Sequence, residues 1–142
     1  MRLVLHTSVM VAALRSGLGA SRQLLVAALE KRMTLLASVP LMIEYEAVLT
    51  RPEHLQVSGL SVREMNTMLD AVAAVAEPVR LSFLWRPTLT DPDDDMVLET
   101  AMNGQADYLV TFNQQDFDEQ AAKLGCPVAL PRKVLHELRR KR

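Results

Sequence analysis

At 142 residues, with 49% hydrophobic and 23% charged side chains, the chain can fold as one domain around a real core, which excludes a disordered polar chain. Its formal net charge of −1 excludes the global basic field that draws many proteins to nucleic acid. The single cysteine, Cys126, excludes an internal disulfide, and no run reaches the roughly 20 apolar residues of a membrane span, so we expect a cytoplasmic protein without a membrane segment.

Strand-like apolar runs alternate with helical patterns along the whole chain. Short apolar runs bounded by polar residues or glycine predict strands over 2–5, 34–37, 79–84, 108–111 and 127–130. Apolar residues at helical spacing predict helices over 21–32, 38–50, 61–77, 93–103, 115–124 and 131–140. Strands that alternate with helices in this way argue for a mostly parallel sheet covered by helices. We expect one α/β domain over residues 1–142, closed by a C-terminal helix and basic tail from about residue 131.

The ends of several predicted helices carry recognisable signals. Ser38, followed by a proline two residues later, is typical of an N-cap and an early helical position. Ser61 followed by Glu64 forms a capping-box signature, in which each side chain satisfies a backbone N–H at the helix start. Pro52 ends the helix that starts at Ser38, so residues 51–60 are predicted to be a connector.

Carboxylates gather at one of these helix starts. The segment Asp91-Pro92-Asp93-Asp94-Asp95 opens a helical pattern, and the chain then returns through a buried strand to another carboxylate, Asp116. Like charges a few ångströms apart repel strongly, so such a cluster is costly unless a cation neutralises it. A hard divalent cation such as Mg²⁺ or Mn²⁺ takes oxygen ligands and commonly works on phosphate esters. The residues therefore predict metal-dependent phosphodiester chemistry.

The expected sheet also predicts where polar residues meet. In an open parallel α/β sheet, ligands bind beyond the carboxyl ends of the strands. Four places then come together, namely His6-Thr7-Ser8, Glu44, Asp93 to Asp95, and Asn113 to Asp116 after the strand that ends at Thr111. Each has an ordinary structural explanation as a core histidine, a solvated helix glutamate, an N-cap or a turn. Only their joint order favours a functional site.

That joint order resembles the PIN-domain nucleases, in particular bacterial toxins of toxin–antitoxin systems related to the VapC ribonucleases. The resemblance is carried by Asp-Met-Val-Leu-Glu-Thr-Ala at 95–101 and by Val-Thr-Phe-Asn-Gln-Gln-Asp-Phe at 110–117, with shorter matches across nearly the whole chain. It implies a parallel sheet with helices on both faces and cleavage of RNA that depends on Mg²⁺ or Mn²⁺. It also implies a cognate antitoxin that blocks the site, and homodimers.

The resemblance further implies roles for individual residues. Glu44, Asp95 and Asp116 match the metal-binding acids of the family. Other groups are expected to orient the first acid and a bound water, to act as outer ligands, or to hydrogen-bond the scissile phosphate. These supporting residues are Thr7, Ser8, Asp93, Asp94, Thr111 and Asn113.

Position 6 departs from the family pattern. Relatives carry an aspartate where this chain has His6. Neutral imidazole offers one softer nitrogen and no charge, which suits Mn²⁺, Zn²⁺ or Ni²⁺ better than Mg²⁺, whereas a protonated ring would repel the cation and pair with Glu44 or Asp95. We therefore expect the chain to be less active than its His6→Asp variant, by about 10²-fold or more. A change selected during cloning, natural loss of activity and an altered metal preference each fit this residue.

Two other classes of function compete with a nuclease. The main alternative is a catalytically degenerate PIN-like module that binds RNA or a protein partner without cleavage, and His6 favours it. A phosphorylated receiver-like domain needs a carboxylate pair after the first strand and a nearby lysine. Position 6 is a histidine, and no lysine lies between Lys31 and Lys123, which argues against that class. RNA cleavage by the chain and by its His6→Asp variant separates the nuclease from the binding module.

Overall fold

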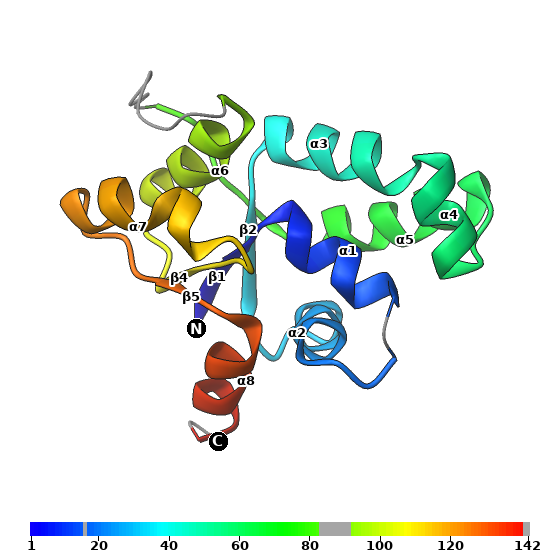
Figure 1. Ribbon diagram of the computed structural model, residues 1–142, viewed down its shortest axis with the longest axis horizontal. Helices are drawn as coiled ribbons and strands as arrows, with labels where there is room; N and C mark the ends of the chain where they lie inside the picture. The colour runs from blue at the N-terminus through cyan, green and yellow to red at the C-terminus, as the bar shows by residue number, and fades with distance from the viewer. Residues whose placement is uncertain (16, 83–91, 141–142) are drawn as a thin grey trace.

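A five-stranded sheet forms the centre of the protein (Figure 1). The computed structural model describes residues 1–15, 17–82 and 92–140. The strands are β1 (Arg2–Leu5), β2 (Thr34–Ala37), β3 (Glu77–Pro78), β4 (Tyr108–Val110) and β5 (Val128–Ala129), in the order β3-β2-β1-β4-β5. Every neighbouring pair is parallel, which confirms the predicted α/β class with its parallel sheet.

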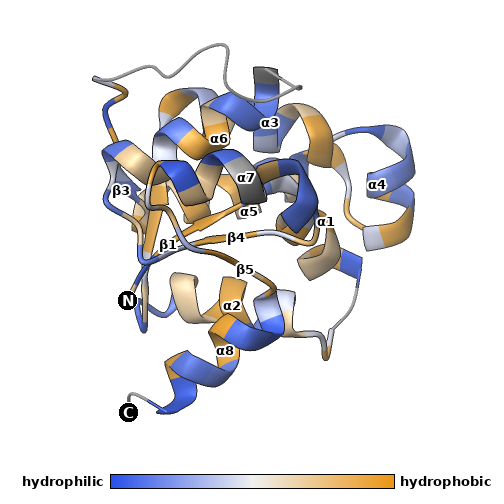
Figure 2. Cartoon of the chain, turned by 60° about the vertical axis from the view of Figure 1, so that its left-hand side comes forward, coloured by the Kyte–Doolittle hydropathy of each residue, from blue (hydrophilic) through white to orange (hydrophobic). Residues whose placement is uncertain are grey.

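Helices cover both faces of this sheet, as expected. Those of the described residues are α1 (Thr7–Arg15), α2 (Ala20–Leu29), α3 (Val39–Leu49), α4 (Pro52–Ser58), α5 (Val62–Val75), α6 (Pro92–Asn103), α7 (Gln114–Lys123) and α8 (Pro131–Arg140). Figure 2 shows α6 and α7 above the strands and α2 and α8 below them. Because both faces are covered, Leu3, Val4 and Leu5 of the central strand β1 are fully buried.

Local sequence signals fix the starts of two helices. The Ser38 hydroxyl caps α3 by accepting a hydrogen bond from the Leu41 N–H at 3.3 Å. Ser61 and Glu64 form the predicted capping box at the start of α5, with both hydrogen bonds at 3.1 Å. Caps of this kind typically stabilise a helix by about 1 kcal/mol. Both helix starts are confirmed because the cap signal and the apolar spacing agree.

Two helices of the structure were not predicted. α1 begins at Thr7, directly after β1, in a segment to which no helix was assigned. α4 occupies Pro52–Ser58, so the prediction of a connector over 51–60 is wrong. Pro52 ends α3 and also takes the first position of α4, and Gly59 closes α4 with a φ of 75°. α4 buries none of its residues, so no apolar periodicity reveals it in the sequence.

The edge strand lies earlier in the chain than predicted. A strand was predicted over 79–84, but β3 covers Glu77–Pro78 and the described residues 79–82 lie outside any strand. The remaining part of that prediction, residues 83 and 84, lies outside the described residues. Pro78 has no N–H to donate, which an edge strand tolerates, and the Val79 N–H donates to the Ala37 carbonyl at 2.9 Å.

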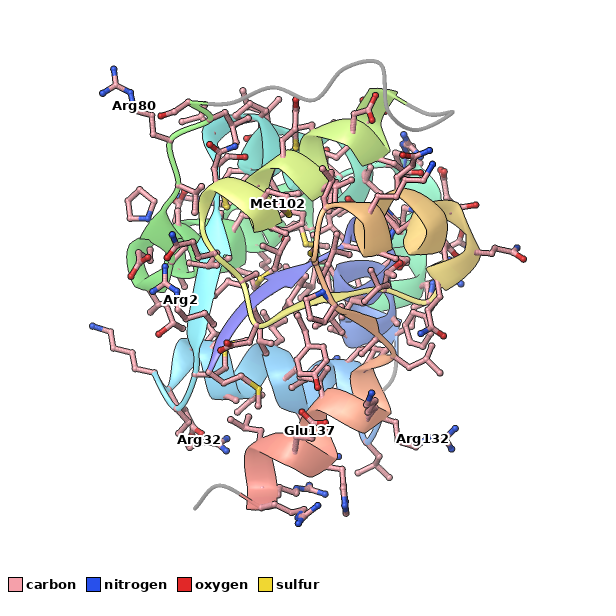
Figure 3. All side chains as sticks on the ribbon, turned by 90° about the vertical axis from the view of Figure 1, so that its left-hand side faces the viewer. Arg2, Arg32, Arg80, Met102, Arg132 and Glu137 are labelled. Carbon is pink, nitrogen blue, oxygen red and sulfur yellow. The ribbon has the colours of Figure 1, made fainter. Side chains whose placement is uncertain are left out.

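The core is aliphatic, and the long basic side chains point away from it. The largest fully buried side chains are Tyr45 and Phe117, packed among leucine, valine and methionine. Burial raises the pKa of the Cys126 thiol to about 11, so this cysteine is a protonated core residue. Figure 3 shows Arg32 and Arg132 extending outward from the body of the protein. Within the described residues, no helix is both long and apolar enough to cross a membrane.

Candidate functional site

A polar cavity of about 360 Å³ opens beyond the carboxyl ends of β1 and β4. It lies where the rule for open parallel sheets predicts a ligand site. Most of the residues singled out from the sequence line it, namely His6, Thr7, Ser8, Glu44, Asp93, Asp94, Asn113 and Asp116. The rest of the wall comes from Val11, Val48, Arg51 and Val97. Another cavity of similar size, about 350 Å³, lies between α3 and α5. Its lining is mainly apolar, so it provides fewer groups that could bind a charged ligand or take part in a reaction.

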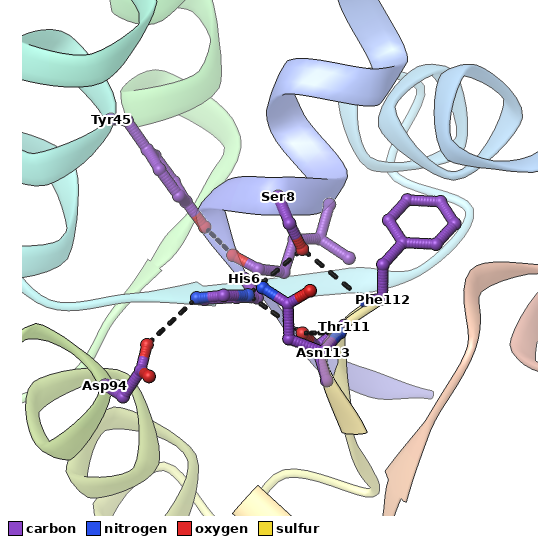
Figure 4. Close-up of polar contacts among 8 residues, drawn as sticks. His6, Ser8, Tyr45, Asp94, Thr111, Phe112 and Asn113 are labelled. Carbon is purple, nitrogen blue, oxygen red and sulfur yellow. Dashed lines mark hydrogen bonds and ion pairs between the residues drawn. The ribbon is translucent and has the colours of Figure 1, made fainter. Parts of the chain in front are cut away.

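His6 is held at the floor of this cavity by polar contacts on both sides of its ring (Figure 4). Nδ1 lies 2.8 Å from the Thr111 hydroxyl and 3.0 Å from the Ser8 hydroxyl, and Nε2 lies 3.2 Å from an Asp94 carboxylate oxygen. The ring also meets Phe117 edge-on, with 5.3 Å between ring centroids. Only 8% of His6 is exposed, so packing and hydrogen bonds fix one orientation of the imidazole.

The surrounding hydrogen bonds favour one tautomer of this ring. The Asp94 carboxylate accepts hydrogen bonds, so Nε2 carries the proton that lies between them. Thr111 and Ser8 already accept backbone N–H groups, from Asn113 at 3.0 Å and from Phe112 at 3.4 Å. Their own hydroxyl protons are then available to Nδ1, which accepts in the neutral imidazole. Thr7, Ser8 and Thr111 thus orient position 6 or line the cavity next to it.

The aspartates at the start of α6 face two different environments, the cavity and the protein core. Asp93 and Asp94 line the cavity, whereas Asp95 is only 3% exposed and does not line it. Glu99, one helical turn after Asp95, is also buried, at 1% exposed, so these two residues share the inward face of α6. The role of metal ligand predicted for Asp95 stays a prediction. Its neighbour Asp94 is the residue that lines the cavity. Asp91, the first acid of this segment, lies outside the described residues.

Carboxylates from three helices face the same space. Glu44 comes from the first half of α3 and is half-buried, Asp94 comes from α6, and Asp116 lies exposed in the first turn of α7. Oxygen ligands of this kind suit Mg²⁺ or Mn²⁺. Among the described residues, however, no three His, Cys, Asp or Glu side chains gather closely enough to hold a metal ion. The oxygen donors suit a hard cation in kind, but their spacing does not form a three-ligand site, and the Asp94 carboxylate contacts His6.

Two further residues gain a role from the structure. Asn113 is the N-cap residue of α7, but its side chain makes no capping hydrogen bond and the residue lines the cavity instead. Arg51 was assigned to a connector, yet it lines the cavity together with Glu44 and Val48. Glu44 and Val48 are one turn apart on α3, and Arg51 follows the C-cap residue of that helix, Thr50. No sequence signal marks Arg51, because the helix that it precedes, α4, buries none of its residues.

Comparison with known proteins identifies the family. Residues 2–115 match the family model of the PIN domain. A solved structure with a similar fold is VapBC2 from Rickettsia felis bound to a DNA fragment from their promoter, with a TM-score of 0.60 and 17% sequence identity. That match covers 90% of this chain and 97% of the other. No curated protein matches the sequence. Since the family model spans most of the chain, this protein belongs to the PIN-domain family.

Proposed function

We propose that this chain is a metal-dependent ribonuclease toxin of a toxin–antitoxin system that hydrolyses RNA phosphodiester bonds. PIN domains are generally nucleases, which supports the reaction class. The observation that carries the proposal is that Glu44, Asp94 and Asp116, from three different helices, line one cavity at the carboxyl ends of the strands. An excess of carboxylates in one cavity is costly without a cation, so the site is suited to a charged ligand from outside the chain.

Because no three acidic side chains of the described residues lie close enough to hold an ion together, a Mg²⁺ or Mn²⁺ ion would bind through one or two of Glu44, Asp94 and Asp116. Water molecules would complete its shell, with Asp93 as an outer ligand. When bound there, the ion supplies an activated water and offsets the negative charge of the phosphate group. The Asn113 amide, which lines the same cavity, would donate a hydrogen bond to a phosphate oxygen. Asp95, the acid first predicted as a ligand, would support Asp94 from the buried side of α6.

His6 is expected to reduce this activity in two ways. Imidazole brings no negative charge to the position, and its Nε2 engages an Asp94 oxygen at 3.2 Å that a metal ion would otherwise need. A nitrogen ligand also shifts the preference from Mg²⁺ towards Mn²⁺ and softer metals. The same contact favours the alternative function, a PIN-like module that binds RNA or a protein partner without cleavage.

Cleavage of structured RNA by the chain and by its His6→Asp variant, each with Mg²⁺ or Mn²⁺, tests the proposal. We expect the variant to cleave faster by about 10²-fold, because it restores a charged ligand and releases Asp94. A double variant, His6→Asp with Asp116→Asn, is the control and should lose the gain. No cleavage by either the chain or His6→Asp would favour the binding module.

The proposed partners are RNA, a cognate antitoxin and a second copy of the chain. The VapBC2 structure, named for a toxin–antitoxin pair, supports the antitoxin, although at 17% identity it shows only the fold of this chain. A small neighbouring reading frame whose product suppresses the toxicity of His6→Asp on co-expression in the cytoplasm would support the assignment. Light scattering of the purified chain tests the homodimer.

A further inference from the structure

A guanidinium stands in the wall of the acidic cavity. Arg51 lines this cavity together with four carboxylates, those of Glu44, Asp93, Asp94 and Asp116. Among the described residues of the wall, it is the one permanent cation. A polyanionic strand that approaches such a wall is repelled unless fixed positive charge offsets the carboxylates. Arg51 is therefore the group in the wall best suited to attract phosphate.

The geometry of α3 sets the position of Arg51 relative to the acids. Glu44 and Val48 lie one turn apart on α3, whereas Arg51 comes two residues after the end of this helix at Leu49, and all three line the cavity. The helix rises roughly 7.5 Å from Glu44 to its end at Leu49, and Arg51 lies beyond that end, so Glu44 and Arg51 face different points along a bound strand. Val48, between them, brings no charge. Because of this distance, RNA would be cleaved near Glu44, whereas Arg51 would only bind the strand.

The backbone of Arg51 is held in one conformation, whereas its side chain is exposed and can contact a ligand. Pro52 at the first position of α4 holds Arg51 in an extended conformation, with φ −62° and ψ 142°. The Arg51 carbonyl accepts the N–H groups of His54 and Leu55, both at 3.0 Å. The side chain is exposed, and within the part of the chain that the structure describes it forms no hydrogen bond or ion pair. A purely structural arginine in an acidic wall would be expected to pair with a carboxylate.

We propose that Arg51 binds a phosphate that flanks the scissile bond and so aligns the RNA strand across the acids of the cavity. This inference rests on the proposed function of the cavity and names how its substrate is held. The planar guanidinium matches two oxygens of a phosphate with two parallel N–H···O hydrogen bonds, which an ammonium group cannot do. The separation between Glu44 on α3 and Arg51 beyond the end of that helix assigns the contact to a flanking phosphate.

RNA binding without cleavage tests the contact directly. A short single-stranded RNA of random sequence is titrated in EDTA over a series of salt concentrations and followed by fluorescence anisotropy. Arg51→Gln is expected to bind about tenfold more weakly at low salt and to flatten the slope of log affinity against log salt by about 0.7, the value for one lost phosphate contact on a single strand. Arg51→Lys keeps the charge and should keep the slope.

The matched control is Arg63→Gln, which removes an exposed arginine from the first turn of another helix, α5. It should bind RNA with the affinity and the salt slope of the unchanged chain. Equal slopes for Arg51→Gln and Arg63→Gln would overturn the proposal, and so would an unchanged chain that does not bind RNA at low salt. The Arg51 side chain caps no helix, so both variants are expected to fold.

Cleavage and metal binding separate this inference from its rivals. In the His6→Asp background with Mn²⁺, Arg51→Gln should raise KM more than it lowers kcat, because the lost contact is one of binding. If His6→Asp cleaves nothing, the proposed function fails, while the salt slopes still decide the role of Arg51. If Arg51 only offsets the carboxylates, or contacts a protein partner, Arg51→Gln leaves the RNA salt slope unchanged. Tighter Mn²⁺ binding by that variant then identifies the charge-offset role.

Discussion

The charged side chains at the two ends of the sheet differ in how they are paired. At the amino end, the Arg2 guanidinium forms two hydrogen bonds with Glu77, at 3.1 and 2.5 Å, and a third with the Gly104 carbonyl at 2.9 Å. The Arg2 backbone N–H donates to Asp107 at 2.7 Å. At the carboxyl end, four carboxylates share a cavity wall with one guanidinium, Arg51, that pairs with none of them.

We interpret this difference as one between a structural end and the end that carries the proposed function. Charges that only join strands are neutralised by neighbours within the chain, as Glu77 is by Arg2. Among the described residues of the cavity wall, four carboxylates outnumber the one arginine, and such an excess of negative charge favours the binding of a cation from outside the chain. This excess of carboxylates is the physical argument for the proposed function. Four predictions test the comparison, from the largest expected effect to the smallest.

The largest effect should separate two adjacent aspartates. In the His6→Asp background, Asp94→Asn is expected to reduce RNA cleavage by about 10²-fold, because a ligand that faces the cavity is lost. Asp95→Asn should mainly lower the free energy of unfolding, by about 1–3 kcal/mol, because a buried, partnered carboxylate is replaced. Parallel cleavage assays and urea unfolding of both variants measure the two effects.

Asp93→Asn is the control for the loss of one charge at the start of α6 and should fall between these two variants in cleavage. If Asp95→Asn abolished cleavage with an unchanged unfolding free energy while Asp94→Asn did not, the acid predicted from the sequence would be the ligand. The division of α6 into a cavity face and a core face would then be wrong as a guide to function.

Asp94 and Asp95 show which features of the cavity can be predicted from the sequence and which cannot. The acidic run, the strand before Thr111 and the helix of Glu44 predict which segments meet, because parallel strands bring their carboxyl ends to one edge. The choice between Asp94 and Asp95 depends on the rotation of α6 about its axis, which one residue of register changes by about 100°. Arg51 was missed for a related reason: α4 is exposed and carries no apolar periodicity. The sequence thus predicts which segments line the cavity, and packing determines which of their side chains face it.

The second prediction concerns metal binding and the stability of the fold. Aspartate at position 6 would lie beside Asp94, so we expect His6→Asp to be less stable than the unchanged chain without metal. Mn²⁺ at about one hundred times its dissociation constant should then stabilise the variant by about 2.7 kcal/mol. The rise in Tm during a Mn²⁺ titration measures this gain.

The unchanged chain should show a smaller rise in Tm at the same Mn²⁺ concentration, since His6 engages Asp94. Adding Asp116→Asn to the variant is the control and should reduce the gain. An equal rise for the unchanged chain and both variants would mean that the ion binds outside the cavity, and the carboxyl end would lose its distinction from the amino end.

The third prediction tests the support beneath the cavity. The buried Tyr45 hydroxyl donates to the carbonyl of Leu5, the last residue of β1 and the neighbour of His6. Burial raises the pKa of this hydroxyl far above its ordinary value, so it remains a donor. Tyr45→Phe is expected to lower the free energy of unfolding by about 1–2 kcal/mol, because a buried carbonyl loses its partner. Urea unfolding measures the change, and Tyr108→Phe, whose hydroxyl bonds the half-buried Glu137 at 3.0 Å, is the control with a smaller loss.

The smallest effect should come from the amino end, and its sign depends on pH. Hydrogen bonds from Arg2, with its charge, lower the pKa of the Glu77 carboxyl below its ordinary value. The stabilisation is therefore fully present above the ordinary carboxyl pKa and is lost as the pH falls through the lowered value. Glu77→Gln should be slightly less stable than the unchanged chain at neutral pH and equal to it in strong acid. Because both side chains are partly exposed, at 38% and 46%, high salt should also remove the difference. A difference in unfolding free energy that persists in acid and in salt would mean that Glu77 acts through packing, and the amino end would then not be held by paired charge.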